Sequence, residues 1–571
     1  MYGNTKNWPF LFFLSVALVL FILLGVRLIY LQVIKGEYYR GLSSQNHIRV
    51  IVTPAPRGVI SDRNGIILAD SKPAFIVSAV PSEFNRINSA LVEQQLEMNE
   101  GEMNDILDEA SSVPHRPVVL REGLGVERVS SIAEDLYRIP GIMIDVAPLR
   151  RYHRPEDFCH ILGYVGLADT QESFRGEVTG RTGLELSLNE ILSGIPGLKR
   201  EVVDALGRVV EEFRGASSED PVPGGNVTLT VDADLQRIAV TELELTGMPG
   251  AVVVIDYENG DILCAASIPT FNPNMFARGI TQDEWNAILD NQDNPLFERA
   301  WAATYPPAST FKVITACWLL SEDLISPDFM PNPCYGSLTL GDTEFGCWTS
   351  HGRLNVVQAL EQSCDVFFYR TAQLGSIDEF AEYSACFGMG SRLADVLIGE
   401  KAGLIPDSDY LNRAYGSDGW GLGNLLNISI GQGELLATPL QLAVISGIIA
   451  SRGEMPHPGI LLQRTIQDPV LSAGVVTDSA FDAVIEGMLR VATSRRGTLY
   501  DAFSDSSLDF WGKTGTAECP GENHALVIGF VRDPMPLAIS VVVEHGGHGS
   551  SVAGPVAERI LSNYFAERGE I

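Results

Sequence analysis

The stretch YPPASTFKVITA, residues 305–316, places a serine three positions before a lysine at the start of an apolar run. If the run is helical, Ser309 and Lys312 lie one turn apart on the same face. One interpretation is structural: the serine caps a helix that follows two prolines, and the lysine faces solvent. The other is chemical, because a nearby lysine can take the proton of a serine hydroxyl and activate it as a nucleophile.

Two short motifs further along the chain favour the chemical interpretation. Ser363 and Asp365 form a Ser-x-Asp pattern, and a Lys-Thr-Gly-Thr pattern begins at Lys513. Together with Ser309 and Lys312 they follow the order that marks serine enzymes reacting with penicillin. The chain has only seven lysines against 33 arginines, so chance is a poor explanation for a lysine in both motifs.

Acyl transfer would explain why these residue types occur together. A serine hydroxyl is a weak nucleophile until a base takes its proton, and Lys312 can be that base if burial and positive neighbours lower its pKa. Arginine could not serve, because its guanidinium stays protonated. We expect Ser363 to relay protons towards the leaving group and Asp365 to hold the Lys312 ammonium in place.

The Lys-Thr-Gly-Thr segment is expected on an edge strand beside the substrate. Lys513 would supply a fixed cation, and the hydroxyls of Thr514 and Thr516 would donate to a substrate carboxylate. Gly515 would let a substrate backbone approach the strand closely. The backbone N–H groups of Ser309 and Thr516 are the expected oxyanion hole.

An apolar segment near the N-terminus predicts a membrane anchor. Residues 8–26 carry no charged side chain, and about 20 apolar residues suffice for a helix to cross the hydrocarbon layer. A cleaved signal peptide is the alternative, but no small-x-small cleavage site follows the segment. We therefore expect a tail at residues 1–7 and an anchor at residues 8–30.

The rest of the chain is long enough for two large domains. At 571 residues the chain exceeds one ordinary core, and a linker rich in proline, glycine and acidic residues gives way to a strand and a helix within residues 217–239. We predict one domain at residues 31–225 and another at residues 226–571. The formal charge of −32 disfavours nucleic acid as a partner.

Turn and strand signals indicate an α+β fold. Asn64-Gly65 and Asn259-Gly260 lie between apolar alternations, as in tight hairpins. A helical stretch is expected near residues 91–110. Strands flanking a helical middle indicate an antiparallel sheet packed with helices. Three successive strands are expected near the end of the chain, within residues 508–518, 524–531 and 537–545.

Taken with these motifs, the chain resembles the class B penicillin-binding proteins nearly from end to end. Segments that resemble the pedestal domain of that family are PRGVISDRNGIILA (56–69), RYHRPEDFCHILGYVG (151–166), GRTGLE (180–185) and VDALGR (203–208). Segments that resemble its catalytic domain are YPPASTFK (305–312), IGQGELLATPLQLA (430–443) and GKTGTAE (512–518).

The resemblance implies a peptidoglycan D,D-transpeptidase. Such an enzyme crosslinks stem peptides through an acyl-enzyme, here on Ser309, is a target of β-lactams, and can have D,D-carboxypeptidase side activity. No cofactor is required for catalysis. A serine β-lactamase shares the motifs, but such enzymes are normally small and secreted. A non-catalytic β-lactam-binding sensor or scaffold is a further alternative, although about seven residues before the span offer no cytoplasmic output domain.

The resemblance also implies a location and partners. The chain would cross the inner (cytoplasmic) membrane once, with residues 1–7 in the cytoplasm. An elongated mixed pedestal domain at residues 31–225 and a transpeptidase domain at residues 226–571 would lie in the periplasm. The expected partners are a SEDS-family glycan polymerase and other elongation-complex membrane proteins.

Two positions depart from the usual family pattern. Asp365 replaces the commoner asparagine, and an ionised aspartate accepts but cannot donate a hydrogen bond to a substrate carbonyl. An aspartate here, together with EHGGHGSSVAGP at residues 544–555, resembles the elongation-type members, with the division type as the alternative. Ala308 replaces a glycine before the serine, a change we expect to be tolerated.

A group of cysteines and a histidine forms a candidate metal site. Cys334, Cys347, His351 and Cys364 make up a complete tetrahedral zinc set. A structural zinc there would pin the loop that leads into Asp365. The alternatives are a Cys334-Cys347 disulfide, or separate buried thiols. His545 and His548 also permit a metal site, although histidines in glycine-rich loops are more often part of surface turns.

Overall fold

The computed structural model describes residues 8–37, 48–112, 114, 117–167, 178–203, 209–212, 219–394, 396–463 and 470–570. The chain forms two compact units. The first combines residues 1–55 with residues 195–222, and the second combines residues 56–194 with residues 223–571. The tail at residues 1–7 and most of the VDALGR segment, residues 204–208, lie outside the described residues.

The first unit contains an apolar helix and a small antiparallel sheet. Helix α1 (Trp8–Ile29) continues into a π-helical turn, η1 (Tyr30–Ile34). Within the described chain, this one helix is long and apolar enough to cross a membrane by its length and composition. The sheet of this unit has the order β1-β8-β9. Its strands are β1 (Ile48–Thr53), β8 (Gly197–Val203) and β9 (Val209–Glu212).

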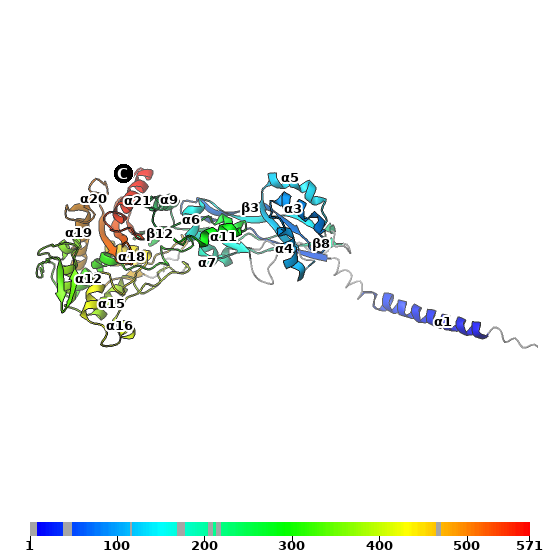
Figure 1. The fold of residues 1–571 in the computed structure, drawn as a ribbon, viewed down its shortest axis with the longest axis horizontal. Helices are drawn as coiled ribbons and strands as arrows, with labels where there is room; N and C mark the ends of the chain where they lie inside the picture. Colours follow the sequence, from blue (N-terminus) through cyan, green and yellow to red (C-terminus); the bar gives the residue numbers. More distant parts are fainter. Residues whose placement is uncertain are drawn as a thin grey trace, which may run out of the picture. The chain divides into compact units, whose positions relative to one another are not determined.

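The second unit begins with a sheet centred on one long strand, β3 (Ile67–Ala79). β3 pairs antiparallel with β2, β4 and β5. Helices gather beside β3 (Figure 1), and buried Val77, Leu96 and Leu136 belong to the apolar core between them. The other elements are β2 (Ile60–Ser61), η2 (Arg86–Asn88), α3 (Ser89–Leu96), α4 (Glu102–Glu109), η3 (Ala110–Ser112), β4 (Val118–Leu124), α5 (Val126–Tyr137), β5 (Ile142–Tyr152), α6 (Pro155–Leu162), β6 (Val165–Leu167), β7 (Val178–Gly180), α7 (Gly183–Ser187), α8 (Asn189–Leu192) and β10 (Val227–Thr228).

One buried ion cluster joins residues from two of the segments that resemble the pedestal domain and Arg150, which directly precedes a third. The carboxylate of Glu185 accepts a hydrogen bond from Arg57 Nε at 2.9 Å and another from Arg150 Nε at 2.6 Å. The Glu185 side chain is 0% exposed, and those of Arg57 and Arg150 are 3% and 1% exposed. Residues 57, 150 and 185 therefore lock distant parts of the chain together, because buried charges are stable only when paired.

The C-terminal part of the second unit is built on a five-stranded antiparallel sheet with the order β12-β11-β19-β18-β17. Its strands are β11 (Gly250–Asp256), β12 (Asp261–Ile268), β17 (Trp511–Ala517), β18 (His524–Val531) and β19 (Leu537–Val543). Every residue of β11 and β19 is buried. Valine and isoleucine dominate both strands, as expected where helices cover both faces of a sheet.

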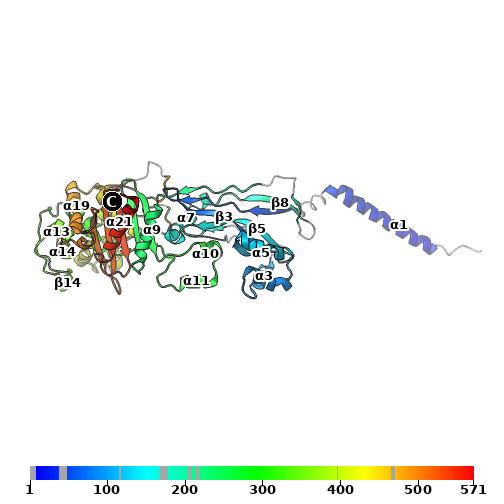
Figure 2. The same cartoon turned by 90° about the horizontal axis from the view of Figure 1, so that it is seen from above.

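Helices cover both faces of this sheet. α9 and α21 pack against each other and against the strands, and they lie side by side in both views (Figures 1 and 2). α18 packs against β11, β18 and β19, and all of its residues are buried. The helices are α9 (Ala233–Glu244), α10 (Asn274–Ala277), α11 (Gln282–Leu289), η4 (Ala308–Phe311), α12 (Lys312–Ser321), α13 (Val356–Glu361), α14 (Asp365–Ala372), α15 (Ile377–Cys386), α16 (Ser408–Tyr415), α17 (Leu422–Ser429), α18 (Pro439–Ala450), α19 (Asp478–Thr493), α20 (Tyr500–Phe503) and α21 (Ala553–Arg568).

The turn and strand predictions are confirmed. Antiparallel pairs join β2 to β3 around Asn64-Gly65 and β11 to β12 around Asn259-Gly260. The three predicted C-terminal strands are β17, β18 and β19. The helical stretch near residues 91–110 is two helices, because Glu97 and Gly101 adopt left-handed backbone conformations between α3 and α4. The described residues also form three two-stranded antiparallel pairs: β6 with β7, β13 (Ser337–Leu340) with β14 (Thr343–Gly346), and β15 (Glu454–Pro456) with β16 (Val470–Ser472).

Candidate active site

Ser309 lies in a short 3-10 turn, η4, that runs directly into the buried helix α12. The turn is fixed by Ala308, whose backbone N–H donates to the Gly431 carbonyl at 2.7 Å. Ala308 has a φ of +51°, a left-handed conformation that glycine adopts more easily than alanine. This explains why a glycine suits the position, and why the alanine is accommodated but strained. Ser309 itself is partly exposed.

Lys312 points into the protein and holds the second motif. Its side chain is 0% exposed, and Nζ donates to Asp365 Oδ1 at 2.6 Å, to the Ser363 carbonyl at 3.0 Å and to Ser363 Oγ at 3.2 Å. A lysine ammonium has three N–H donors, so these contacts use its full donor capacity. The structural alternative, a helix cap followed by a solvated lysine, does not describe this arrangement.

Lys513 is also buried, and it reaches the same serine from the other side. Nζ donates to Ser363 Oγ at 2.8 Å and to the Thr514 carbonyl at 3.1 Å. Burial, and then the nearby Lys312 ammonium, hold the pKa of Lys513 well below its usual range. Burial raises the pKa of Asp365, while the Lys312 ammonium opposes that shift. The hydroxyl of Ser363 thus lies between two lysines.

The strand β17 lies against the η4 turn, as the predicted roles of residues 514–516 require. A Cβ added to Gly515 would lie 2.9 Å from Thr310 Cγ2 and 3.1 Å from the Pro307 carbonyl oxygen. The glycine therefore allows the strand to contact the nucleophile turn of its own chain. β17 and η4 also carry the backbone N–H groups of Thr516 and Ser309, the expected oxyanion hole.

Sequence reasoning missed two residues that hold this strand. Gln432 Nε2 donates to the Thr516 carbonyl at 3.1 Å, and Thr498 and Thr514 share a hydrogen bond of 2.7 Å between their hydroxyls. Gln432 belongs to the IGQGELL segment quoted above, but its type and position indicated no role. Thr498 follows α19 in no recognisable motif, so only its position in the fold identifies it.

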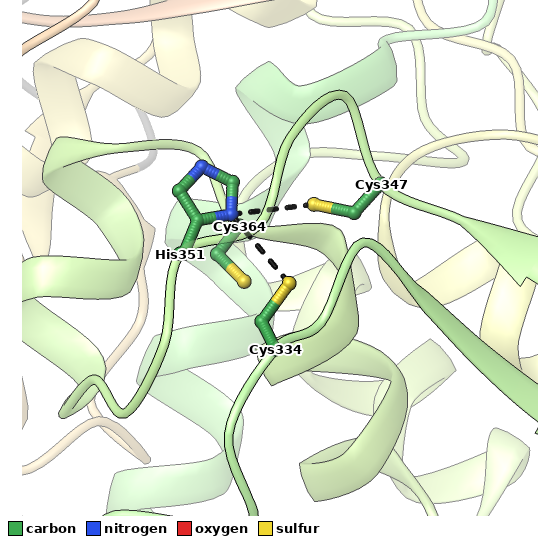
Figure 3. Close-up of side chains that lie close together, drawn as sticks. All are labelled: Cys334, Cys347, His351 and Cys364. Atoms are coloured by element: carbon green, nitrogen blue, oxygen red, sulfur yellow. Dashed lines mark hydrogen bonds between the residues drawn. The ribbon is translucent and has the colours of Figure 1, made fainter.

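The four predicted metal ligands converge, as Figure 3 shows. His351 Nδ1 lies 3.5 Å from Cys347 Sγ and 3.7 Å from Cys334 Sγ, and the Cys364 thiol points into the same space. All four ligand atoms lie within 4.8 Å of one another. Zinc with bonds of about 2.0 to 2.3 Å requires such ligand atoms to lie roughly 3.5 to 3.8 Å apart. The donor set and its spacing fit a tetrahedral zinc.

The same cluster contacts the catalytic motif directly. The backbone N–H of Asp365 donates to Cys347 Sγ at 3.3 Å. The Cys364 thiol and then His351 lower the pKa of Cys347 against the effect of burial, and Cys347 together with burial raises the pKa of Cys364. The direction of these shifts favours deprotonation of Cys347 over Cys364, and the thiolate is the form that binds metal. The structure describes Cys334 and Cys347 as free thiols.

The chain matches two families of known domains. The description "Penicillin binding protein transpeptidase domain" matches residues 250–562, and "Penicillin-binding Protein dimerisation domain" matches residues 52–229. Peptidoglycan D,D-transpeptidase MrdA of Acinetobacter baumannii is 30% identical over 581 residues, which cover 95% of this chain and 85% of that protein.

Two solved structures have the same fold over most of the chain. One is the complex between penicillin-binding protein PBP2 and MreC from Helicobacter pylori, with a TM-score of 0.79 and 27% identity over 92% of this chain and 100% of that chain. The other concerns the structural coordination of polymerization and crosslinking by a peptidoglycan synthase complex, with a TM-score of 0.73 and 27% identity over the full length of both chains. With both domains matched in this order, the chain belongs to the penicillin-binding protein family, as a class B member.

Proposed function

We propose that this protein is a serine-type peptidoglycan D,D-transpeptidase of the elongation type. One observation carries the proposal: Lys312, Ser363, Asp365 and Lys513 form one hydrogen-bonded network, and Lys312 begins the helix that directly follows the turn with Ser309. The family relationship and the similarity to a D,D-transpeptidase that covers nearly the whole chain support the same reaction. β-Lactams would acylate the same serine as mimics of its peptide substrate.

The reaction transfers an acyl group twice. Ser309 Oγ attacks the carbonyl carbon of the penultimate D-Ala of a stem peptide and loses its proton to the enzyme. The bond between that carbon and the nitrogen of the terminal D-Ala breaks, and the departing amine takes a proton. An amine of a neighbouring stem peptide then attacks the ester carbonyl, loses a proton, and the serine oxygen regains one as it leaves.

The hydrogen-bond network defines a route for these protons. Lys312 can act as a base only after one of its three N–H bonds gives up a proton, since all three are used in the resting arrangement. Ser363 Oγ is the hydroxyl through which that proton moves. Lys513, whose pKa is lowered, donates the second hydrogen bond to Ser363 Oγ. Asp365 Oδ1 accepts a hydrogen bond from Lys312 Nζ at 2.6 Å and so holds the lysine in place.

Substrate recognition is assigned to the β17 strand. The hydroxyls of Thr514 and Thr516 bind the substrate carboxylate, and the Lys513 charge lies behind them rather than at the surface, because its side chain is 0% exposed. The backbone N–H groups of Ser309 and Thr516 stabilise the oxyanion. Because β17 binds the substrate in this proposal, the hydrogen bond from Gln432 to the Thr516 carbonyl contributes by holding the strand in place.

Membrane attachment and partners follow from the same proposal. The apolar helix α1 anchors the chain in the cytoplasmic membrane, with residues 1–7 in the cytoplasm, the pedestal at residues 31–225 and the transpeptidase domain at residues 226–571 in the periplasm. Similar proteins have been solved with MreC and within a peptidoglycan synthase complex. We assign this chain partners of the same two kinds, an elongation-complex protein and a glycan polymerase.

A structural zinc at Cys334, Cys347, His351 and Cys364 is part of the proposal. The thiolate and imidazole donors fit zinc in kind and spacing. When bound, the metal would fix the loop before α14, and the hydrogen bond from Asp365 N–H to Cys347 Sγ would pass that constraint to the Lys312 ion pair.

Metal analysis of the purified full chain tests the zinc site. We expect zinc to fall by one equivalent in Cys347→Ser and His351→Ala, and both variants to acylate more slowly with penicillin than the wild type. Cys386→Ser, a half-buried cysteine in α15, serves as the matched control and should keep its zinc. Recovery of a Cys334-Cys347 disulfide peptide, with zinc unchanged in Cys347→Ser, would reject the site.

The activity is tested with the full chain and its polymerase partner on a glycan carrying pentapeptides. Crosslinked muropeptides and released D-Ala, both lost in Ser309→Ala, are the expected result. D-Ala released without crosslinks would indicate a carboxypeptidase.

Depletion of the protein from cells discriminates the elongation type from the division type: rounded cells indicate a role in elongation, and filaments would indicate division.

A further inference from the structure

A second cluster of metal-binding side chains lies beyond the C-terminal end of β17 and includes His545, but not His548, of the two histidines considered from the sequence. Cys519 follows β17, His524 begins β18, and His545 follows β19 by two residues. One ligand atom from each lies within 4.8 Å of the others. Cys519 Sγ is 3.8 Å from the Nδ1 atoms of both His524 and His545.

The sheet topology brings Cys519, His524 and His545 close together. β17 and β18 are joined by the turn that contains Cys519, and β18 pairs with β19 so that Ala525 lies opposite Val543. The start of β18 and the end of β19 therefore share one corner of the sheet with that turn. His545 adopts a φ of +54°, a conformation that residues other than glycine rarely hold unless the surroundings impose it.

The side chains already converge on one point. The Cys519 thiol lies 3.0 Å from the carbonyl oxygen of Glu522, and His545 Nδ1 lies 2.9 Å from the same oxygen. His524 Nδ1 accepts the backbone N–H of His545 at 3.0 Å. Ligation through these atoms would exchange the three contacts for metal bonds and release the thiol proton, while the neutral His545 imidazole would carry its hydrogen on Nε2.

We propose that Cys519, His524 and His545 form a second metal site, for a zinc-class divalent cation, with an open fourth position. One sulfur and two nitrogens suit Zn²⁺, and three protein ligands leave a position for water. The observed separations of 3.8 Å exceed the value for a bound zinc, roughly 3.5 Å, by an amount that small side-chain rotations remove.

The second metal site would act as a clip beside the substrate strand. It ties the turn after β17 to the loop after β19, so it fixes the end of the strand that carries Thr516. The ring of His524 also packs edge-on against Tyr305, with centroids 5.5 Å apart, and Tyr305 lies four residues before Ser309. The second metal site would therefore support two segments, β17 and the stretch before Ser309, that carry the proposed catalytic and substrate-binding residues.

The test is the zinc content of the full chain after equilibration with Zn²⁺ and gel filtration. We expect two equivalents in the wild type, and one in each of Cys519→Ser, His545→Gln and Cys347→Ser. The double variant Cys347→Ser, Cys519→Ser should hold none. His548→Gln, which changes the neighbouring histidine of the same loop, should keep two. Because different variants remove the ligands of the two sites, a failure of one proposed zinc site leaves the test of the other site intact.

Alkylation of Cys519 provides a second measurement that does not depend on activity. Zinc should slow alkylation of the Cys519 peptide by about tenfold or more, because a ligated thiolate is not free to react, and His545→Gln should abolish this protection. Cobalt in Cys347→Ser should give a thiolate charge-transfer band that Cys519→Ser removes. One zinc in the wild type, unchanged in Cys519→Ser and with Cys519 equally reactive with and without metal, would overturn the proposal. Zinc lost on gel filtration would mean an adventitious ion only, with the same consequence.

Discussion

The ammonium of Lys312 and the carboxylate of Asp365 form an ion pair 2.6 Å long in which the lysine side chain is fully buried. The two residues come from different motifs, 53 positions apart in the sequence, and Ser363 completes the network between them. The pair fixes the Lys312 side chain in α12, which directly follows the turn that carries Ser309, so the proposed activation of the serine by Lys312 depends on it.

Removing the carboxylate should therefore cost both stability and reactivity. Asp365→Ala leaves a buried ammonium without its partner, and such a change destabilises a protein by about 3 to 5 kcal/mol. Asp365→Asn keeps a hydrogen-bond acceptor and should fold normally, with penicillin acylation reduced less than in the alanine variant. Stopped-flow acylation and thermal unfolding measure the two effects. Equal acylation rates in Asp365→Ala and the wild type would contradict the role of the pair.

The contact between β17 and the nucleophile turn predicts an effect of Gly515→Ala. The added methyl group would meet Thr310 and Pro307 at about 3 Å, and such overpacking costs about 1 to 3 kcal/mol. Acylation should slow because the strand moves away from Ser309. Gly125→Ala, at a glycine with open space around it, is the matched control. A Gly515→Ala enzyme with wild-type acylation and melting temperature would show that the close approach is not required.

The buried Arg57-Glu185-Arg150 cluster predicts a large stability effect far from the catalytic serine. Glu185→Ala leaves two buried guanidinium groups without a carboxylate, which should lower the free energy of unfolding by about 3 to 5 kcal/mol. Glu134→Ala breaks an exposed pair with Arg138 and should cost under about 1 kcal/mol. Denaturant unfolding of both variants checks the contrast, and similar losses in the two would refute it.

His160 predicts a pH dependence of stability. Burial lowers the pKa of His160 from 6.5 to about 4 in the folded protein, where Nε2 contacts the Pro269 carbonyl at 3.0 Å. Between these two values the unfolded chain binds a proton that the folded protein does not, so the free energy of unfolding falls as the pH drops through this window. A shift of this size corresponds to at most about 3 kcal/mol.

His160→Gln keeps a donor for the Pro269 carbonyl but cannot titrate. The difference in unfolding free energy between wild type and variant should therefore change in favour of the variant as the pH falls from 6.5 to 4, and stay constant below that. All other titrating groups are common to both proteins and cancel. A difference that does not vary with pH would contradict the lowered pKa.

Sequence motifs identified the candidate site residues, but not the tertiary contacts that hold them in place. Ser309, Lys312, Ser363 and Lys513 were identified because their chemistry requires fixed types at fixed spacing, and the fold brings the last three into direct contact. The role of Gly515 toward a substrate backbone stays a prediction, and the structure adds a contact that the sequence did not predict, between this glycine and the turn of its own chain. Such contacts depend on tertiary packing, which spacing along the chain does not encode.

The sequence did not predict which residues distant along the chain pair with one another. Arg57, Arg150 and Glu185 occur in or beside segments that resemble the pedestal domain, but one sequence gives no indication that they pair with one another. The candidate metal ligands were likewise predictable only where they lie close together in the sequence. Cys334, Cys347, His351 and Cys364 lie within 31 residues and were recognisable, whereas Cys519 and His524 became candidates only when the sheet brought them to His545.

The most direct test is intact-protein mass spectrometry of the full chain after incubation with a labelled penicillin, beside Ser309→Ala, Lys312→Ala and Asp365→Asn. The account predicts one stable adduct on Ser309 in the wild type, a slower adduct in Asp365→Asn, and none in the other two variants, with all four proteins folded. An adduct that persists in Ser309→Ala, or a folded wild-type protein that forms none, would contradict the assignment of Ser309 as the nucleophile.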